Sequence, residues 1–126
     1  TNDYTSYSNS GSLKNVIRHL RYNIRVIKKL NPSAKVYGIL PISRYDLNGM
    51  NRDSMSDMYG YTYHDLRVAE AKAYKSLGAK VVNFNQFAPH IITNENKDVT
   101  LEDHEIHPTP QTAQKLGYAL AKELIK

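Results

Sequence analysis

The sequence predicts an α/β protein in which a parallel sheet is flanked by helices. Segments with helical periodicity alternate with short apolar runs, in the order helix, strand, loop, helix, strand, loop, helix. Strands separated by a helical crossover pair in parallel, and the crossover is right-handed. Short and nearly uninterrupted apolar runs are typical of strands buried on both faces of such a sheet.

The first helix is predicted over residues 13–30. Ser12 is the expected N-cap, and Asn31-Pro32 ends the helix because proline has no N–H for the hydrogen-bond ladder. Apolar residues recur at steps of three and four and form one face for the core. These residues are Leu13, Val16, Ile17, Leu20, Ile24, Ile27 and Leu30.

A first strand is predicted within residues 35–42, "KVYGILPI", and a long polar loop follows over 43–61. Thr62 and Asp65 have the spacing of a capping box, in which each side chain accepts the backbone N–H of the other residue. They open the second helix, and Gly78 closes it because glycine readily adopts the left-handed conformation that ends many helices.

A second strand is predicted over residues 79–85, followed by a loop without regular period that reaches residue 108. Thr109 as cap and Pro110 at the first helical position start the final helix. Five of its residues are expected to face the core, namely Ala113, Leu116, Leu120, Ala121 and Leu124.

Two strands are few for this architecture. A pair of strands with three helices leaves an apolar and unpaired sheet edge. We therefore expect further strands encoded before Thr1, and interpret residues 1–126 as the C-terminal part of a single domain. The alternative is a small complete domain of unusual shape.

Composition narrows the class of protein. Hydrophobic residues make up 40% and charged residues 23% of the 126 residues, as in globular domains. The sequence has no cysteine, which excludes disulfide scaffolds, thiolate metal sites and cysteine nucleophiles. No apolar run approaches the ~20 residues of a membrane span. The compartment is left open.

The chain is basic, with a formal charge of +5. Part of this charge forms a second stripe on the first helix, made of Lys14, Arg18, Arg21, Arg25 and Lys28. The charge permits an acidic partner such as nucleic acid, an anionic glycan or a membrane surface, but does not require one. A solvated helix face is the simpler interpretation.

The segment "LEDHEIHPT", residues 101–109, is the most informative place for chemistry. In open α/β sheets functional groups collect in loops beyond the carboxyl ends of the strands, where this segment is predicted to lie. Asp103, His104, Glu105 and His107 crowd together there. A carboxylate beside a histidine is the pair that orients and polarises a general base.

Two motifs resemble those of a known enzyme family. "DHEIHPTPQTAQKLGYALA" resembles the last conserved block of the SGNH hydrolases, the GDSL lipase and esterase family, and "TNDY" resembles its Gly-x-Asn-Asp block without the glycine. The resemblance implies a flavodoxin-like fold, a three-layer parallel sheet with flanking helices. It also implies that the nucleophilic serine, which the family carries in a Gly-Asp-Ser block, lies outside this chain together with the N-terminal strands.

The resemblance assigns roles to individual residues. His107 corresponds to the general base, and Asn2 to a donor that aims its amide at the developing oxyanion. The family places its aspartate three residues before the histidine, where this chain has His104, whereas Asp103 lies four before it. Asp103, Glu105 or a main-chain carbonyl can therefore orient His107, and we favour Asp103.

Other candidate residues are less specific. His104 and His107 could hold a metal ion with Asp103 or Glu105, but proline follows His107 and no third histidine is near, so no metal is expected. Arg44 and Tyr45 follow the first strand and are the candidate substrate contacts. Tyrosines elsewhere are expected in the core rather than stacked on sugars.

The resemblance therefore implies a serine ester hydrolase that acts on acyl, for example acetyl, esters of glycans or lipids. No metal or organic cofactor is implied, and no nucleic-acid partner or membrane span. The expected partners are the ester substrate and the missing N-terminal segment of the same protein. The competing hypothesis is a non-catalytic module on the same scaffold that binds an anionic polymer through the basic stripe.

Overall fold

The computed structural model describes residues 12–126, and these residues form an α/β fold. In chain order the elements are α1 (Leu13–Leu30), β1 (Tyr37–Ile39), the 3-10 turn η1 (Arg52–Ser54), α2 (Tyr63–Ser76), β2 (Lys80–Val82), α3 (Phe84–Phe87), α4 (Lys97–Thr100) and α5 (Pro110–Leu124). None of the helices in the described part has the length and apolar character needed to cross a membrane.

The two strands pair in parallel, as the sequence predicts, with Gly38 opposite Val81. They are shorter than the predicted 35–42 and 79–85. One further bond lies beyond the end of β1, where the N–H of Leu40 donates to the carbonyl of Val82 at 2.9 Å. The pairing ends there because the other strand turns into a helix, with Asn83 as the N-cap of α3.

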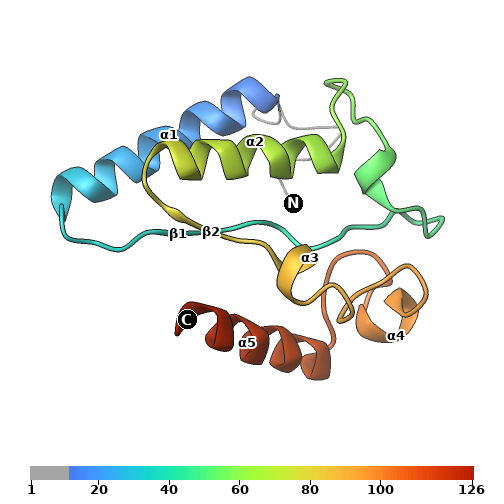
Figure 1. Ribbon diagram of the computed structural model, residues 1–126. Helices are drawn as coiled ribbons and strands as arrows, with labels where there is room; N and C mark the ends of the chain where they lie inside the picture. Colours follow the sequence, from blue (N-terminus) through green and yellow to red (C-terminus); the bar gives the residue numbers. More distant parts are fainter. Residues whose placement is uncertain (1–11) are drawn as a thin grey trace.

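Helices lie on both sides of this strand pair. In Figure 1, α1 and α2 run above the strands, and α5 runs below them. The packing of α2 on β1 is tight, because a Cβ on Gly38 would lie 2.2 Å from Cγ of Tyr74. Glycine at this position lets the helix approach the strand closely.

The predicted helix starts and stops are confirmed. The Ser12 side chain accepts the N–H of Asn15, and the Thr109 side chain accepts that of Thr112. The capping box is complete: Asp65 N–H donates to Thr62 Oγ1 at 3.1 Å, and Thr62 N–H donates to Asp65 Oδ2 at 2.9 Å. After α2, Gly78 has φ +70°.

The buried residues form two main clusters. Val16, Tyr61, Tyr63 and Leu66 join α1 to α2, and the other cluster joins the segment from α3 onward to α5. The second cluster is Phe84, Ala88 and Ile91, with Ile42, Phe87, Ile92, Leu116, Ala119 and Leu120 packed against it. Tyr61 and Tyr63 are buried, as predicted for the tyrosines other than Tyr45, whereas Tyr22, Tyr37 and Tyr118 are exposed.

Some residues that were expected to face the core are exposed. Ala113 and Ala121 of α5 are exposed, because the helix contacts α3 through Leu116 and its neighbours instead. On α1, Ile27 is 46% and Leu30 80% exposed, since the helix extends beyond the region that α2 covers. Helical periodicity identifies an apolar face but not how much of it a neighbour covers.

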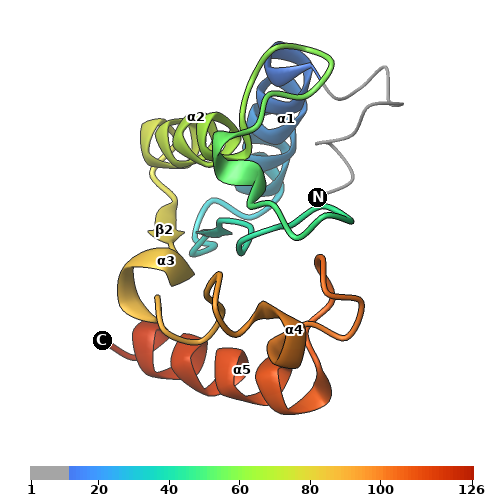
Figure 2. The same ribbon diagram turned by 90° about the vertical axis from the view of Figure 1, so that its right-hand side faces the viewer.

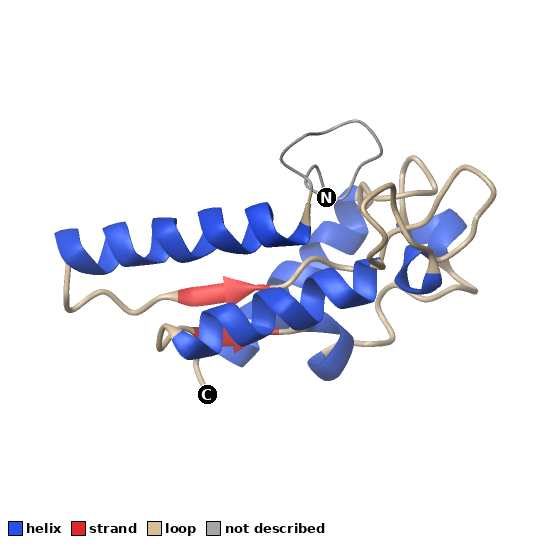
Figure 3. Cartoon of the chain, turned by 90° about the horizontal axis from the view of Figure 1, so that it is seen from above, coloured by secondary structure: helices blue, strands red, loops and turns tan. Residues whose placement is uncertain are grey.

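Two single-turn helices, α3 and α4, lie in segments predicted as strand end and irregular loop. Each has only four residues, which is too short for a periodic apolar pattern to appear. Figure 3 shows that the long loops gather at the end of the molecule toward which β1 points.

Candidate active site

The segment between α4 and α5 forms a closed loop at this end of the molecule. Its two ends are joined by an antiparallel bridge between Leu101 and Pro108. The N–H of Glu102 donates to the carbonyl of His107 at 2.7 Å, and Leu101 is 1% exposed. A buried anchor and a closed bridge therefore hold the residues between them, which Figure 2 shows beside α4.

Asp103 organises this loop through one carboxylate oxygen. Its Oδ1 accepts the N–H groups of Glu105, Ile106 and His107 at 3.0, 2.9 and 3.0 Å. His104 has φ +60°, a left-handed conformation that turns the chain back over the carboxylate. The turn therefore arranges three backbone donors around a single acceptor.

The second oxygen of Asp103 contacts the imidazole of His107. Oδ2 lies 2.5 Å from Nδ1, while the His107 side chain is 72% exposed and that of Asp103 35%. A carboxylate at Nδ1 favours the tautomer with the proton on Nδ1, so the opposite nitrogen Nε2 can accept a proton. Of the three groups considered for orienting His107, Asp103 contacts the ring, although it lies four residues away.

Hydrogen bonding keeps Asp103 ionised. Desolvation by burial raises the pKa of its carboxyl group, but hydrogen bonds from the backbone of His107, Ile106 and Glu105 and from the His107 ring outweigh it. The pKa of Asp103 is therefore held well below its usual range. An ionised carboxylate is the state that stabilises an imidazolium.

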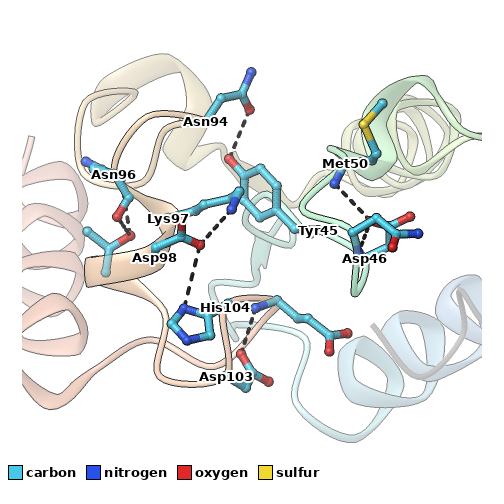
Figure 4. Close-up of polar contacts among 12 residues, drawn as sticks. Tyr45, Asp46, Met50, Asn94, Asn96, Lys97, Asp98, Asp103 and His104 are labelled. Atoms are coloured by element: carbon cyan, nitrogen blue, oxygen red, sulfur yellow. Dashed lines mark hydrogen bonds and ion pairs between the residues drawn. The ribbon is translucent and has the colours of Figure 1, made fainter.

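His104 contacts a different carboxylate, that of Asp98. Its Nδ1 lies 3.6 Å from Oδ1 of Asp98, which also pairs with Lys97 Nζ at 2.6 Å (Figure 4). The two histidines of the segment thus face different carboxylates. Within residues 12–126, no group of three or more histidine, aspartate or glutamate residues has the arrangement of a metal site.

Tyr45 lies beneath the loop rather than open to a substrate. It is 1% exposed, its hydroxyl donates to Asn94 Oδ1 at 3.2 Å, and its N–H donates to the carbonyl of Glu105 at 3.0 Å. Lys97 Nζ lies 5.8 Å from the centre of its ring. This burial corrects the prediction of Tyr45 as a substrate contact, because the side chain fills the space under the loops (Figure 4).

Arg44, the other predicted substrate contact, is half-buried. Its carbonyl accepts the N–H of Arg52 at 2.9 Å, which closes the loop that precedes η1. A substrate contact by the Arg44 side chain stays a prediction. Asn2, the predicted oxyanion donor, lies outside the described residues.

A small pocket adjoins the Asp103 turn. It has a volume of about 370 Å³ and lies between the turn at Asp46–Gly49 and the segment from Lys97 to Glu105. Four carboxylate residues line it, Asp46, Asp98, Asp103 and Glu105. Sequence reasoning did not identify Asp46, Lys97 or Asp98, since the three lie in loop segments that only the fold brings together.

The basic stripe on α1 is partly used for packing. Lys14, Arg18 and Arg25 are exposed, whereas Lys28 Nζ donates to the carbonyl of Leu77 at 2.5 Å at the end of α2. One of the five cations therefore connects two helices.

Comparisons with known proteins add no evidence on the family or the site. No family model matches the sequence, and no curated protein and no solved structure is detectably similar to it. The interpretation of the site therefore depends on its residues and geometry.

Proposed function

We propose that the chain is the C-terminal part of an SGNH-type serine ester hydrolase, with Asp103 and His107 as the acid and base of its catalytic triad. The observation that carries the proposal is the 2.5 Å contact between Asp103 Oδ2 and His107 Nδ1, with the imidazole exposed. The serine belongs to polypeptide outside these residues, in the Gly-Asp-Ser block that the resemblance implies.

The proposed reaction follows from the proton positions. As the serine oxygen bonds to the ester carbonyl carbon, its proton passes to Nε2 of His107. Asp103 stabilises the resulting imidazolium through Nδ1–H. When the carbon–oxygen bond of the ester breaks, Nε2 returns the proton to the leaving alcohol. Water then repeats the sequence and releases the carboxylic acid. Asn2 would donate its amide to the oxyanion.

The arrangement of the elements supports the same proposal. Helices lie on both sides of a parallel strand pair, as a flavodoxin-like three-layer fold requires. The Asp103 turn lies among loops at the end of the molecule toward which β1 points, where ligands bind in open α/β sheets.

The pocket beside Asp103 supports a glycan as the substrate rather than an anionic lipid. Lys97 pairs with Asp98, and the remaining carboxylates Asp46, Asp103 and Glu105 leave the pocket with net negative charge, so it repels anions and suits the hydroxyl groups of a neutral sugar. Within the proposal, an acyl group such as acetyl on a glycan is the favoured substrate.

The test uses the longer polypeptide that includes the residues encoded before Thr1, assayed with p-nitrophenyl acetate and with acetylated glycans. His107→Ala is expected to lower kcat by about 10⁴-fold or more, and Asp103→Asn by up to about 10⁴-fold. His19→Ala, on the exposed side of α1, is the matched control and should keep full activity. Wild-type hydrolysis by the His107→Ala protein would refute the assignment.

The competing function, binding of an anionic polymer, is supported by the exposed cations Lys14, Arg18 and Arg25 of α1. Such binding would weaken steeply with rising salt, because it releases condensed counterions. A longer polypeptide that binds such a polymer in this way and hydrolyses no ester would favour the binding module.

A further inference from the structure

A second pocket lies away from the Asp103 turn, between α2 and the segment that follows β2. Its volume is about 550 Å³, and it shares no lining residue with the pocket beside Asp103. In Figure 2, α2, β2 and α3 follow one another along one side of the molecule, and the Asp103 loop lies toward the other side. The two pockets are thus separate.

One face of α2 supplies the basic side of this pocket. His64, Arg67, Lys72 and Lys75 line it, and together with Val68 and Ala71 they follow helical steps of three and four residues. Among the described residues that line the pocket, none is an aspartate or glutamate. The pocket therefore presents positive charge without a neutralising carboxylate in its wall.

Contacts with Asp53 and Tyr63 fix the side chain of Arg67. Its side chain is 7% exposed, one guanidinium nitrogen pairs with Asp53 Oδ2, and the guanidinium carbon lies 5.2 Å from the centre of the Tyr63 ring. Nη1 of Arg67 is buried and has no hydrogen-bond partner within the described part of the chain. Because the Asp53 carboxylate neutralises Arg67, the positive charge of the pocket comes from Lys72 and Lys75, while the guanidinium is fixed beneath it with one buried N–H group unpaired.

Amide side chains supply the opposite wall. Asn83, Asn85 and Gln86 line it directly after β2. The Oδ1 of Asn83 accepts the N–H of Asn85 at 3.1 Å, which orients the amide, and its NH₂ group carries two donors. Residues that carry donor groups therefore line the pocket both on α2 and on the segment after β2.

We propose that this pocket binds a small ligand through a tetrahedral oxyanion, a phosphate or sulfate group. Ammonium groups on one wall and an amide donor on another approach an anion from different directions, and a tetrahedral oxyanion has acceptor oxygens facing each of them. A planar carboxylate has two oxygens and satisfies fewer of these donors. The inference is independent of the proposed ester hydrolysis, because it concerns other residues and a binding event.

The test is an amide NMR titration of the isotope-labelled chain with sodium phosphate, sodium sulfate and sodium acetate at one constant ionic strength. Phosphate and sulfate are expected to shift the resonances of residues 64–75 and 83–86 saturably. Acetate is expected to bind at least about tenfold more weakly, because it offers fewer acceptors. The same spectra report whether each variant is folded.

The double variant Lys72→Gln/Lys75→Gln is expected to weaken phosphate binding by tenfold or more, since it removes two charge-assisted donors. Lys115→Gln/Lys122→Gln on α5 removes the same charge elsewhere and should leave the affinity unchanged. Equal loss in both double variants, shifts that do not saturate, or equal binding of acetate would each overturn the proposal. Loss of ester hydrolysis in the longer polypeptide would not bear on it.

Discussion

At the scale of single residues, Asp103 has two tasks that use different oxygens. Oδ1 accepts hydrogen bonds from three backbone N–H groups and thereby stabilises the turn, while Oδ2 contacts the ring of His107. Each task depends on the other, because the turn brings His107 back over the carboxylate. The candidate acid thus also builds the loop that presents the candidate base.

The double role of Asp103 makes its titration informative. Because the folded-state pKa of its carboxyl is lowered, the stabilisation that it provides is present above the ordinary value of about 3.9 and is lost as pH falls through the lower folded value. Carboxyl-carbon NMR of the folded chain should show an Asp103 midpoint below 3.9.

The Asp103→Asn variant is the control for this titration. Its amide oxygen can still accept the backbone N–H groups, but it has no carboxyl to titrate. The turn resonances that follow the Asp103 midpoint in the wild type should therefore lose that acid transition. A midpoint at or above the ordinary aspartate value would contradict the hydrogen-bonding account.

Residue spacing alone could not decide which group orients His107. Asp103 lies four residues before the histidine, one more than the family pattern, and Glu105 lies closer in sequence. The left-handed conformation at His104 shortens the path of the chain and brings Asp103 to the ring. A non-glycine residue in this conformation is uncommon, so the sequence carries little signal for it.

At the scale of elements, capping residues predicted where the helices begin and end, but periodicity did not predict which apolar residues of a helix are buried. Ser12, Thr62 and Thr109 cap their helices because a side-chain oxygen satisfies a nearby N–H, which requires only a few neighbouring residues. The exposure of Ala113 and Ala121 depends instead on what packs against α5, and that is set by distant parts of the chain.

The contact between α2 and β1 provides a test at this scale. Gly38→Ala is expected to destabilise the fold by about 1–3 kcal/mol, because the added Cβ overlaps the base of the Tyr74 ring and α2 must move. Urea unfolding of the chain measures the change.

Gly117→Ala in α5 is the matched substitution. Apart from its chain neighbours and the backbone of its own helix, no atom lies within 4 Å of the added Cβ, and alanine favours the helix, so stability should rise by up to about 1 kcal/mol. Opposite signs for the two variants are expected. A neutral Gly38→Ala would show that α2 does not pack on β1 as closely as described.

At the scale of the whole molecule, buried polar contacts connect the long loop to the helical layer. Arg67 of α2 pairs with Asp53 of η1, and both lie beside Tyr63, which is 0% exposed. The loop that follows β1 is thereby tied to the core formed by α1 and α2. These contacts join segments that no local pattern connects.

The burial of Tyr63 predicts that the free energy of unfolding falls at alkaline pH. Burial raises the pKa of its hydroxyl, an effect that the nearby Arg67 and Arg44 only partly oppose. The folded state disfavours the phenolate, so stability is present below the ordinary value of about 10 and is lost as pH rises above it. Urea unfolding between pH 7 and 11 should show this decline.

Tyr63→Phe removes the titrating group and should make the decline above pH 10 shallower, by on the order of 1 kcal/mol per pH unit. The difference between the two proteins at pH 7 serves as the reference. Parallel curves for wild type and variant across the alkaline range would contradict the prediction.

The sequence by itself determined the helix caps, the parallel order of the strands and the loop that contains Asp103 and His107, because these follow from neighbouring residues and from chain order. Only the tertiary structure decided that Asp103 contacts the imidazole, that Tyr45 is buried under the loops and that the cations of α2 face amides after β2. The first contact depends on the left-handed turn at His104, and the other two join residues far apart in the chain, so no periodic pattern encodes them.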